Sequence, residues 1–264
     1  MTSGLTERDR AKADRHAALL HEASRLFAER GFSGVSLEDL GAAVGVSGPA
    51  VYRHFANKQA LLGAILVGVS ERLLAGGQEV VGTDAAALTQ LNALVCFHVD
   101  FALSDADVIR VQDRDLASLS DADRSTVRRL QRAYVELWMG VLARLHPTRA
   151  VSDLRVRAHA CFGLINSTPH SVRGGRDAPA DSTVRGILET MALSALGIWI
   201  SDLERRAPQH HAQPSSIARP GSRRTPPRSV RNRAPCSPST RRWSNDRLSV
   251  ITSRSAISPR CSHG

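Results

Sequence analysis

Residues 36–55 read SLEDLGAAVGVSGPAVYRHF, and this stretch decides the fold. It predicts two short helices separated by a tight turn. Ser36 is a good N-cap for the first helix, and Asp39 three residues later gives a pattern close to a capping box. Gly45 can adopt a positive φ without steric cost and ends that helix, while Ser47 can cap the second, whose first turn tolerates a proline. Two helices joined this tightly form a helix-turn-helix.

Apolar residues at helical spacing flank this unit on both sides. We expect a helix from about residue 14 to residue 30, ending at Gly31, and another that Asn57 caps and that runs to about Gly76. The cluster of Gly76, Gly77 and Gly82 breaks it. Three helices of this kind can bury one small core. The residues expected in that core are Leu20, Phe27, Leu40, Val51 and Phe55.

Residues 27–62 read FAERGFSGVSLEDLGAAVGVSGPAVYRHFANKQALL, and this run resembles the N-terminal DNA-binding domain of the tetracycline-repressor (TetR) family. The resemblance covers about residues 17–66. It implies an all-α protein with an N-terminal three-helix helix-turn-helix domain and a C-terminal helical domain for ligand binding and dimerisation. The most specific spacing is Gly45, Val46, Ser47, then Val51, Tyr52, His54, Phe55 and Lys58; departures from the usual pattern are Gly41, Val44, Pro49 and Gln59.

The resemblance also implies which residues meet DNA. The second helix of the unit enters the major groove, with its first half at base edges and its end at phosphates. Arg53 suits either a guanine or a phosphate contact, and the sequence leaves both open. The DNA-binding residues we expect are Ser36, Ser47, Gly48, Pro49, Ala50, Tyr52, Arg53, His54 and Lys58.

The net charge of +10 in 264 residues is placed unevenly. Residues 204–264 hold 13 Arg and two acidic residues, whereas the rest of the chain holds 22 basic and 23 acidic residues. The body is therefore nearly neutral. Specific DNA affinity has to come from a local basic patch near Arg53, His54 and Lys58 on a dimer.

We divide the chain into a polar N-terminal arm (1–13), the DNA-binding domain (14–60), a helical ligand-binding and dimerisation domain (61–203) and a disordered tail (204–264). The tail is rich in Arg, Ser and Pro without apolar periodicity. One interpretation gives it no selected function. The other lets it bind nucleic acid non-specifically through Arg241, Arg242 and Trp243.

Five further helices are expected in the C-terminal domain. The first begins at Thr83 or Asp84 and ends near 103, and the second begins at Ser104 with Asp107 behind it. The third begins at Ser120 and ends at Pro147. The last two cover about 152–168, ending near a proline, and about 182–203, and the resemblance implies that they pair with their twins in a dimer.

Aromatic residues and one histidine lie on the apolar faces of these helices. They are either plain core or the lining of an apolar cavity, since helical bundles build both from the same residue types. A lone histidine on such a face is a hydrogen-bonded core residue in one interpretation and a ligand contact in the other. The candidate ligand-binding residues are Phe97, His98, Phe101, Tyr134, Trp138 and Phe162.

We interpret the chain as a sequence-specific, ligand-responsive homodimeric repressor of a palindromic double-stranded operator. Its effector would be small and hydrophobic, such as an acyl-CoA, a lipid or a drug-like molecule. The alternative is a non-specific DNA-binding protein acting through the tail. We expect no enzyme, cofactor or metal, because the sequence lacks a Gly-rich phosphate loop, a GxSxG motif and clustered metal ligands. The polar N-terminus and the absence of an apolar run near about 18 residues predict a cytoplasmic, nucleoid-associated protein without a membrane partner.

Overall fold

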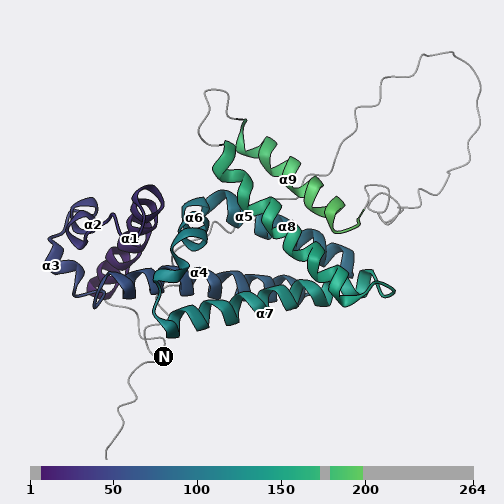
Figure 1. Cartoon of the computed structure of the whole chain (residues 1–264), viewed down its shortest axis with the longest axis horizontal. Coiled ribbons are helices and arrows are strands. Elements are labelled where there is room, and N and C mark those ends of the chain that lie inside the picture. Colours follow the sequence, from purple (N-terminus) through teal and green to yellow (C-terminus); the bar gives the residue numbers. More distant parts are fainter. Residues whose placement is uncertain (1–6, 173–178, 199–264) are drawn as a thin grey trace, which may run out of the picture.

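The structure is a computed structural model that describes residues 7–172 and 179–198. Within these ranges all regular elements are helices, as predicted. Figure 1 shows α1, α2 and α3 at one end, α4 and α7 side by side along the long axis, and α8 and α9 beside α5. The elements are α1 (Glu7–Arg30), α2 (Leu37–Ala43), α3 (Gly48–Val51), α4 (Lys58–Val81), α5 (Ala87–Ser104), α6 (Ala106–Asp115), the 3-10 helix η1 (Leu116–Ser118), α7 (Asp121–Leu145), α8 (Val151–Val172) and α9 (Asp181–Ala195).

The helix-turn-helix forms where the sequence predicts it. The hydroxyl of Ser36 accepts a hydrogen bond from the Asp39 amide at 3.1 Å, and the Asp39 carboxylate accepts one from the Ser36 amide at 2.8 Å. This completes the capping box. Gly45 has a φ of 70° and follows the end of α2, as expected.

The second helix of the unit is shorter than predicted. α3 spans only Gly48–Val51, and the chain continues in a turn where the Phe55 amide donates to the Val51 carbonyl at 3.1 Å. Ser47 occupies the N-cap position, but its side chain makes no cap hydrogen bond. The proline in the first turn has no amide proton, so one amide fewer lacks a partner there and the start of α3 needs a capping side chain less.

A small apolar core holds these helices together. Leu20, Phe27, Leu40, Val51 and Phe55 are all buried, with exposed fractions from 0% to 9%, so this prediction is confirmed. α1 begins at Glu7 rather than at residue 14, so that part of the expected N-terminal arm is helical.

The helix after the unit continues past Gly76 and Gly77, two of the three glycines expected to break it, and ends at the third. Asn57 accepts a hydrogen bond from the Ala60 amide at 2.7 Å and caps α4 as predicted. α4 then runs to Val81, and Gly82 lies at its C-cap.

Close packing explains why α4 contains glycine in its interior. A β-carbon at Gly76 would overlap the ring of Phe97 on α5, and one at Gly77 would lie 2.7 Å from the ring of Tyr134 on α7. These two positions therefore let the helices approach one another, and the packing outweighs the low helix propensity of glycine.

Two helix starts in the C-terminal domain differ from the predictions. The Thr83 hydroxyl donates to the Val80 carbonyl at 2.9 Å and so closes α4, while α5 begins at Ala87. Ser104 is the last residue of α5, because the Asp105 amide still donates to a carbonyl within that helix. α6 therefore begins at Ala106. Ser120 caps α7 as predicted.

The ends of the last two helices also differ. α8 runs through Pro169 to Val172, since a proline weakens a helix that is held by packing without always ending it. α9 ends at Ala195, ahead of Gly197 with a φ of 84°. The predicted end at 203 and the tail 204–264 lie outside the described residues.

By length and composition alone, α4 and α5 are apolar enough to cross a membrane. The expectation that no run approaches this length was therefore wrong by that measure. In the structure 44% and 50% of their apolar windows are buried, and both helices pack in the bundle, which accounts for their composition.

Candidate nucleic-acid interface and ligand cavity

The predicted recognition helix is exposed at one end of the molecule. Val51 is fully buried on its inner side, whereas Pro49 and Arg53 face solvent and Tyr52 exposes 54% of its surface. A tyrosine left open in this way presents a hydroxyl that suits a phosphate contact. Three further predicted residues are half-buried: Gly48 and Ala50 on α3, and His54 in the turn after it.

Both serines of the predicted DNA-binding set are exposed, but only one has its hydroxyl engaged. Ser36 donates to the Asp39 carboxylate at 2.8 Å and accepts from the Asp39 amide. A phosphate contact by Ser36 has to share this hydroxyl with the helix cap. The hydroxyl of Ser47 makes no cap bond.

Lys58 has a role that the sequence did not indicate. Its ammonium donates to the carbonyls of Phe32 and Val35, both at 2.7 Å, and lies 4.5 Å from the centre of the Phe32 ring. It therefore ties the start of α4 to the segment between α1 and α2, and combines two charge-assisted hydrogen bonds with a cation–π contact. The expected phosphate contact stays a prediction, for which one ammonium proton remains.

A cavity of about 230 Å³ lies inside the C-terminal domain. Four of the six predicted ligand-binding residues line it, namely His98, Phe101, Tyr134 and Phe162. The other lining residues come from α4, α6, α7 and α8, and no pattern in the sequence indicated them: Ser70, Leu73, Val108, Ile109, Gln112, Leu130, Gln131, Val135, His159 and Asn166.

The other two predicted residues do not line the cavity. Phe97 packs over Gly76 of α4, where it fills the space that the glycine leaves. Trp138 is fully buried and stands edge-on to Phe162, with ring centres 4.9 Å apart. Trp138 therefore belongs to the core behind the cavity wall.

A chain of hydrogen bonds runs along one wall. The Tyr134 hydroxyl lies 3.3 Å from Nδ1 of His98, and Nε2 of His98 lies 3.1 Å from Oδ1 of Asn166. Burial lowers the pKa of His98 to about 4, so its imidazole is neutral near pH 7. With the Asn166 oxygen facing Nε2, the consistent tautomer donates from Nε2 and accepts the Tyr134 proton at Nδ1. Burial also raises the pKa of Tyr134 above its ordinary value.

The lining of the cavity carries no Lys, Arg, Asp or Glu among the described residues. Its polar groups are neutral amides, hydroxyls and imidazoles set among apolar side chains. Such a site favours an apolar ligand with one or two hydrogen-bonding groups over a charged one, because a buried charge without a partner is costly.

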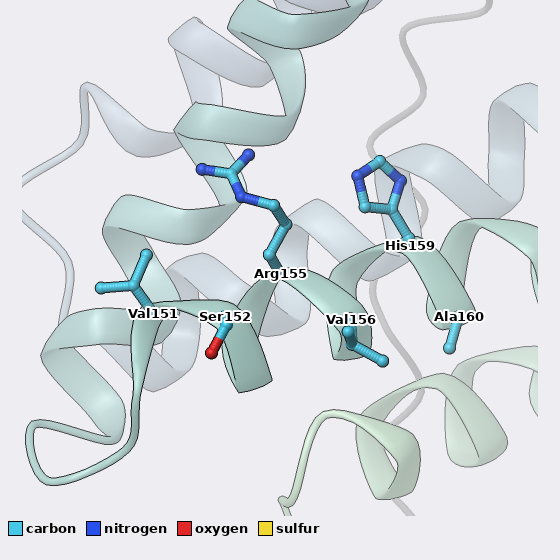
Figure 2. A pocket seen from close by; sticks show the side chains of 6 residues that line it. All are labelled: Val151, Ser152, Arg155, Val156, His159 and Ala160. Carbon is cyan, nitrogen blue, oxygen red and sulfur yellow. The ribbon is translucent and has the colours of Figure 1, made fainter.

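The outer face of α8 and α9 exposes apolar side chains. They are Val151 with 64% of its surface exposed, Val156 with 68%, Ile187 with 52% and Met191 with 50%. Figure 2 shows that Val156 and Ala160 project to one side of α8, at a shallow surface depression that also includes His159. Apolar residues grouped in this way are typical of a protein interface.

Two family models match the chain. The model described as bacterial regulatory proteins, tetR family, matches residues 19–65, and the model described as tetracyclin repressor-like, C-terminal domain, matches residues 84–170. The first contains the helix-turn-helix, and the second contains most of the cavity wall.

The HTH-type transcriptional repressor KstR2 of Rhodococcus jostii (strain RHA1) is 30% identical over 132 residues, which cover 50% of this chain and 65% of that protein. The match thus spans just under two thirds of the relative. A solved TetR-family regulator from Bordetella parapertussis 12822 has a TM-score of 0.60 at 22% identity and covers 67% of this chain and 93% of its own.

The solved structure of AibR in complex with isovaleryl coenzyme A and operator DNA has a TM-score of 0.55 at 19% identity, over 67% of this chain and 97% of that one. At such identities the two solved structures establish a shared fold. The two family models in sequence order, the helix-turn-helix and the helical domain behind it agree with one another. The chain belongs to the tetracycline-repressor (TetR) family of bacterial regulatory proteins.

Proposed function

We propose that this chain is a homodimeric transcriptional repressor that binds a palindromic operator and releases it when a small apolar effector fills the cavity. The observation that carries the proposal is that α4 and α6 each contact both the DNA-binding unit and the cavity. α4 begins at the DNA-binding unit and contributes Ser70 and Leu73 to the cavity. Members of this family are DNA-binding regulators and not enzymes, in agreement with the expectation from the sequence.

On the DNA side, the accessible residues of α3 and of the turn after it suit the major groove. Gly48, Pro49 and Ala50 would meet base edges, while Tyr52 and His54 would meet phosphates. One short helix covers only a half-site. A dimer would therefore need an inverted repeat with half-site centres about one helical turn, roughly 34–36 Å, apart.

On the dimer side, the exposed apolar face of α8 and α9 supports an isologous interface. Val156, Ile187 and Met191 would be covered by the same residues of a second copy. Ala192 is fully buried within the protomer, so it supports the packing of α9 rather than the contact between protomers.

On the effector side, the size and polarity of the cavity narrow the class of molecule that could bind. A volume of about 230 Å³ lies below the range of about 300–1,000 Å³ typical of pockets for drug-sized molecules. It suits a short acyl chain or a comparable part of a lipid or drug-like molecule. AibR, which shares the fold, was solved with isovaleryl coenzyme A, and this supports testing short acyl-CoA esters first. The neutral lining would hold the acyl part and leave the charged nucleotide outside.

Coupling between the sites would run through α6 as well as α4. Val108, Ile109 and Gln112 of α6 form part of the cavity wall. At the end of the same helix, Arg114 donates to backbone carbonyls at the end of α1, and Asp115 accepts from a backbone amide just beyond α1. A ligand that moves the wall would therefore move the support of the DNA-binding unit.

The experiment uses the full chain and a random pool of DNA duplexes. Selection of bound duplexes should enrich an inverted repeat, and anisotropy titration should then show weaker binding when a short acyl-CoA, a fatty acid or a drug-like molecule saturates the cavity. Allosteric coupling is typically about 1–3 kcal/mol, or roughly 5- to 150-fold in affinity. If the selection enriched no sequence motif, the proposal for the DNA site would be wrong. If a ligand saturated the cavity and left operator affinity unchanged, that ligand would not be the effector.

The alternative, non-specific DNA binding through the Arg-rich tail, makes the opposite prediction for a truncated chain. Ending the chain after Leu203 removes the 13 Arg of residues 204–264. The repressor would keep its operator preference and lose only affinity that fades steeply with salt. A non-specific binder would lose DNA binding altogether.

A further inference from the structure

The first half of α1 lies against the turn that follows the recognition helix. The imidazole of His16 stacks on the ring of Phe55, with centres 4.8 Å apart and 27° between the planes. Its centre is 6.1 Å from that of His54. In the helix, His16 precedes the buried Leu19 by about one turn, so its ring faces the DNA-binding core rather than solvent.

Two cations of α1 surround this pair of histidines. Lys12 lies one turn before His16 on the same face of α1, and Arg15 neighbours Lys12 three positions later; both cations are exposed, and both act on the charge of His54. Arg53 adds a third cation from the turn after α3, next to His54. Lys58, at the start of α4, is turned away toward the carbonyls of the segment between α1 and α2.

The pKa values of both histidines reflect these neighbours. Partial burial, followed by the charges of Lys12, Arg15 and Arg53, lowers the pKa of His54. Burial, followed by His54 and Lys12, lowers the pKa of His16. The charged groups that act on the pair from α1 and from the turn after α3 are thus all positive, and both rings are mainly neutral at pH 7 in the free protein.

The repulsion between the positive charges of this cluster decreases when an anion binds beside it. Arg53 and His54 of this cluster directly follow the exposed Tyr52 at the end of the recognition helix, so the anion nearest to the cluster in a DNA complex is the phosphate backbone beside the half-site. We propose that the first half of α1 is a second DNA-contacting element, in which Lys12, Arg15 and the neighbouring imidazoles of His16 and His54 bind the backbone phosphates that flank the base contacts of α3. This inference rests on the proposed function and extends its interface to residues outside the helix-turn-helix.

Proton uptake follows from the same geometry. A phosphate placed beside the two imidazoles stabilises their charged forms, so the complex binds protons that the free protein does not. Operator affinity should therefore rise as the pH falls from about 7.5 to about 6. This proton uptake by His16 and His54 occurs only in the DNA complex, because in the free protein the neighbouring cations oppose protonation.

The test measures operator affinity by anisotropy with the full chain over a range of salt. Lys12→Ala/Arg15→Ala should weaken binding to all duplexes, by on the order of ten-fold at low salt, and should reduce the slope of log K against log salt by about one unit for each phosphate that is no longer neutralised. The matched control is Arg10→Ala, an exposed cation of α1 that points away from the face of Lys12 and Arg15. It should leave both quantities at their wild-type values.

A second measurement uses pH and the variant His16→Phe. Phenylalanine can still stack on Phe55 but cannot take up a proton, so the variant should keep its melting temperature and lose part of the gain in affinity between pH 7.5 and 6. Equal affinity and salt slope for the double variant and for Arg10→Ala would overturn the inference, even if the wild type binds its operator normally. Wild-type protein that binds no duplex at all would overturn the proposed function and the inference with it.

Discussion

Asp115, the last residue of α6, accepts a hydrogen bond from the backbone amide of Phe32 across 3.3 Å. Phe32 follows α1, and Asp115 is only 8% exposed. The neighbouring Arg114 donates to the carbonyl of Phe27, one of the last carbonyls of α1. Because Gln112 lies one turn earlier in the cavity wall, α6 is a short connection between the cavity and the DNA-binding unit.

Asp115→Ala should weaken the response to an effector more than it weakens DNA binding itself. The change removes the acceptor for Phe32, so movement of α6 is no longer transmitted to the end of α1. Operator affinity would be measured with and without a saturating ligand. Coupling between two binding sites is typically about 1–3 kcal/mol. We therefore expect the ratio of operator affinities without and with ligand to be smaller in the variant than in the wild type by about five-fold or more. Asp107→Ala, at the exposed start of α6, is the control, and a full ligand response in Asp115→Ala would exclude this route.

Lys58→Ala should lower both stability and DNA affinity. The stability loss comes from the carbonyls of Phe32 and Val35, which lose a charged donor, and should be about 1–3 kcal/mol because the site is only partly buried. Thermal melting would show this as a decrease of several degrees. The salt slope of operator binding should also fall by about one unit if the third ammonium proton reaches a phosphate. A lowered melting temperature with an unchanged slope would leave Lys58 with the structural role alone.

The parts of the fold that depend on local chemistry could be predicted from the sequence. The capping box of Ser36 and Asp39, the positive φ of Gly45 and the caps at Asn57 and Ser120 depend on residues within three or four positions of each other. Helical spacing likewise indicated the core around Phe27. These signals are independent of how distant helices are arranged.

The errors about the glycines of α4 and about the cavity arose because a distant helix decides the outcome there. Gly76 was interpreted as a helix breaker because the ring of Phe97, twenty-one positions later, is not visible in the local pattern. For the same reason the cavity could be predicted only in part. Helical spacing places Tyr134 and Trp138 on one face of α7, but only Tyr134 lines the cavity, while Trp138 is buried in the core. Nothing in the sequence around Asn166 indicated its hydrogen bond to His98.

Gly77→Ala should destabilise the protein, and Gly68→Ala should not, although both lie in α4. The new β-carbon at Gly77 would lie 2.7 Å from the ring of Tyr134, which is buried and bonded to His98, so the ring has to move. We expect a cost of about 1–3 kcal/mol. At Gly68 no atom lies within 4 Å, so alanine should stabilise the helix by up to about 1 kcal/mol. Urea unfolding measures both values, and an equal effect of the two changes would contradict the packing role of Gly77.

Ile187→Glu/Met191→Glu should produce a monomer that loses operator affinity. Both side chains are about half exposed on α9, so the protomer tolerates glutamate there, whereas an interface between copies does not. Light scattering after size exclusion gives the mass, and anisotropy gives the affinity. Ala143→Glu, at an exposed site on α7, should change neither. A double variant that stays dimeric would show that this face is not the interface.

His98 should make the protein less stable as the pH falls below about 6.5. Its pKa is about 4 in the folded protein, against an ordinary value of 6.5, because burial disfavours the charged imidazole. The unfolded chain therefore binds a proton in this range that the folded chain does not, so stability is complete above about pH 6.5 and is lost as the pH falls toward 4. At pH 5 the loss from this residue should be about 2 kcal/mol.

Urea unfolding at pH 7 and pH 5 would compare the wild type with His98→Gln, which cannot titrate. The substitution has a constant cost of its own, through the bonds to Tyr134 and Asn166, but that cost cancels in the difference between the two pH values. We expect the wild type to lose about 2 kcal/mol more than the variant between pH 7 and pH 5, and parallel losses would mean that His98 is protonated in the folded protein as readily as in the unfolded chain.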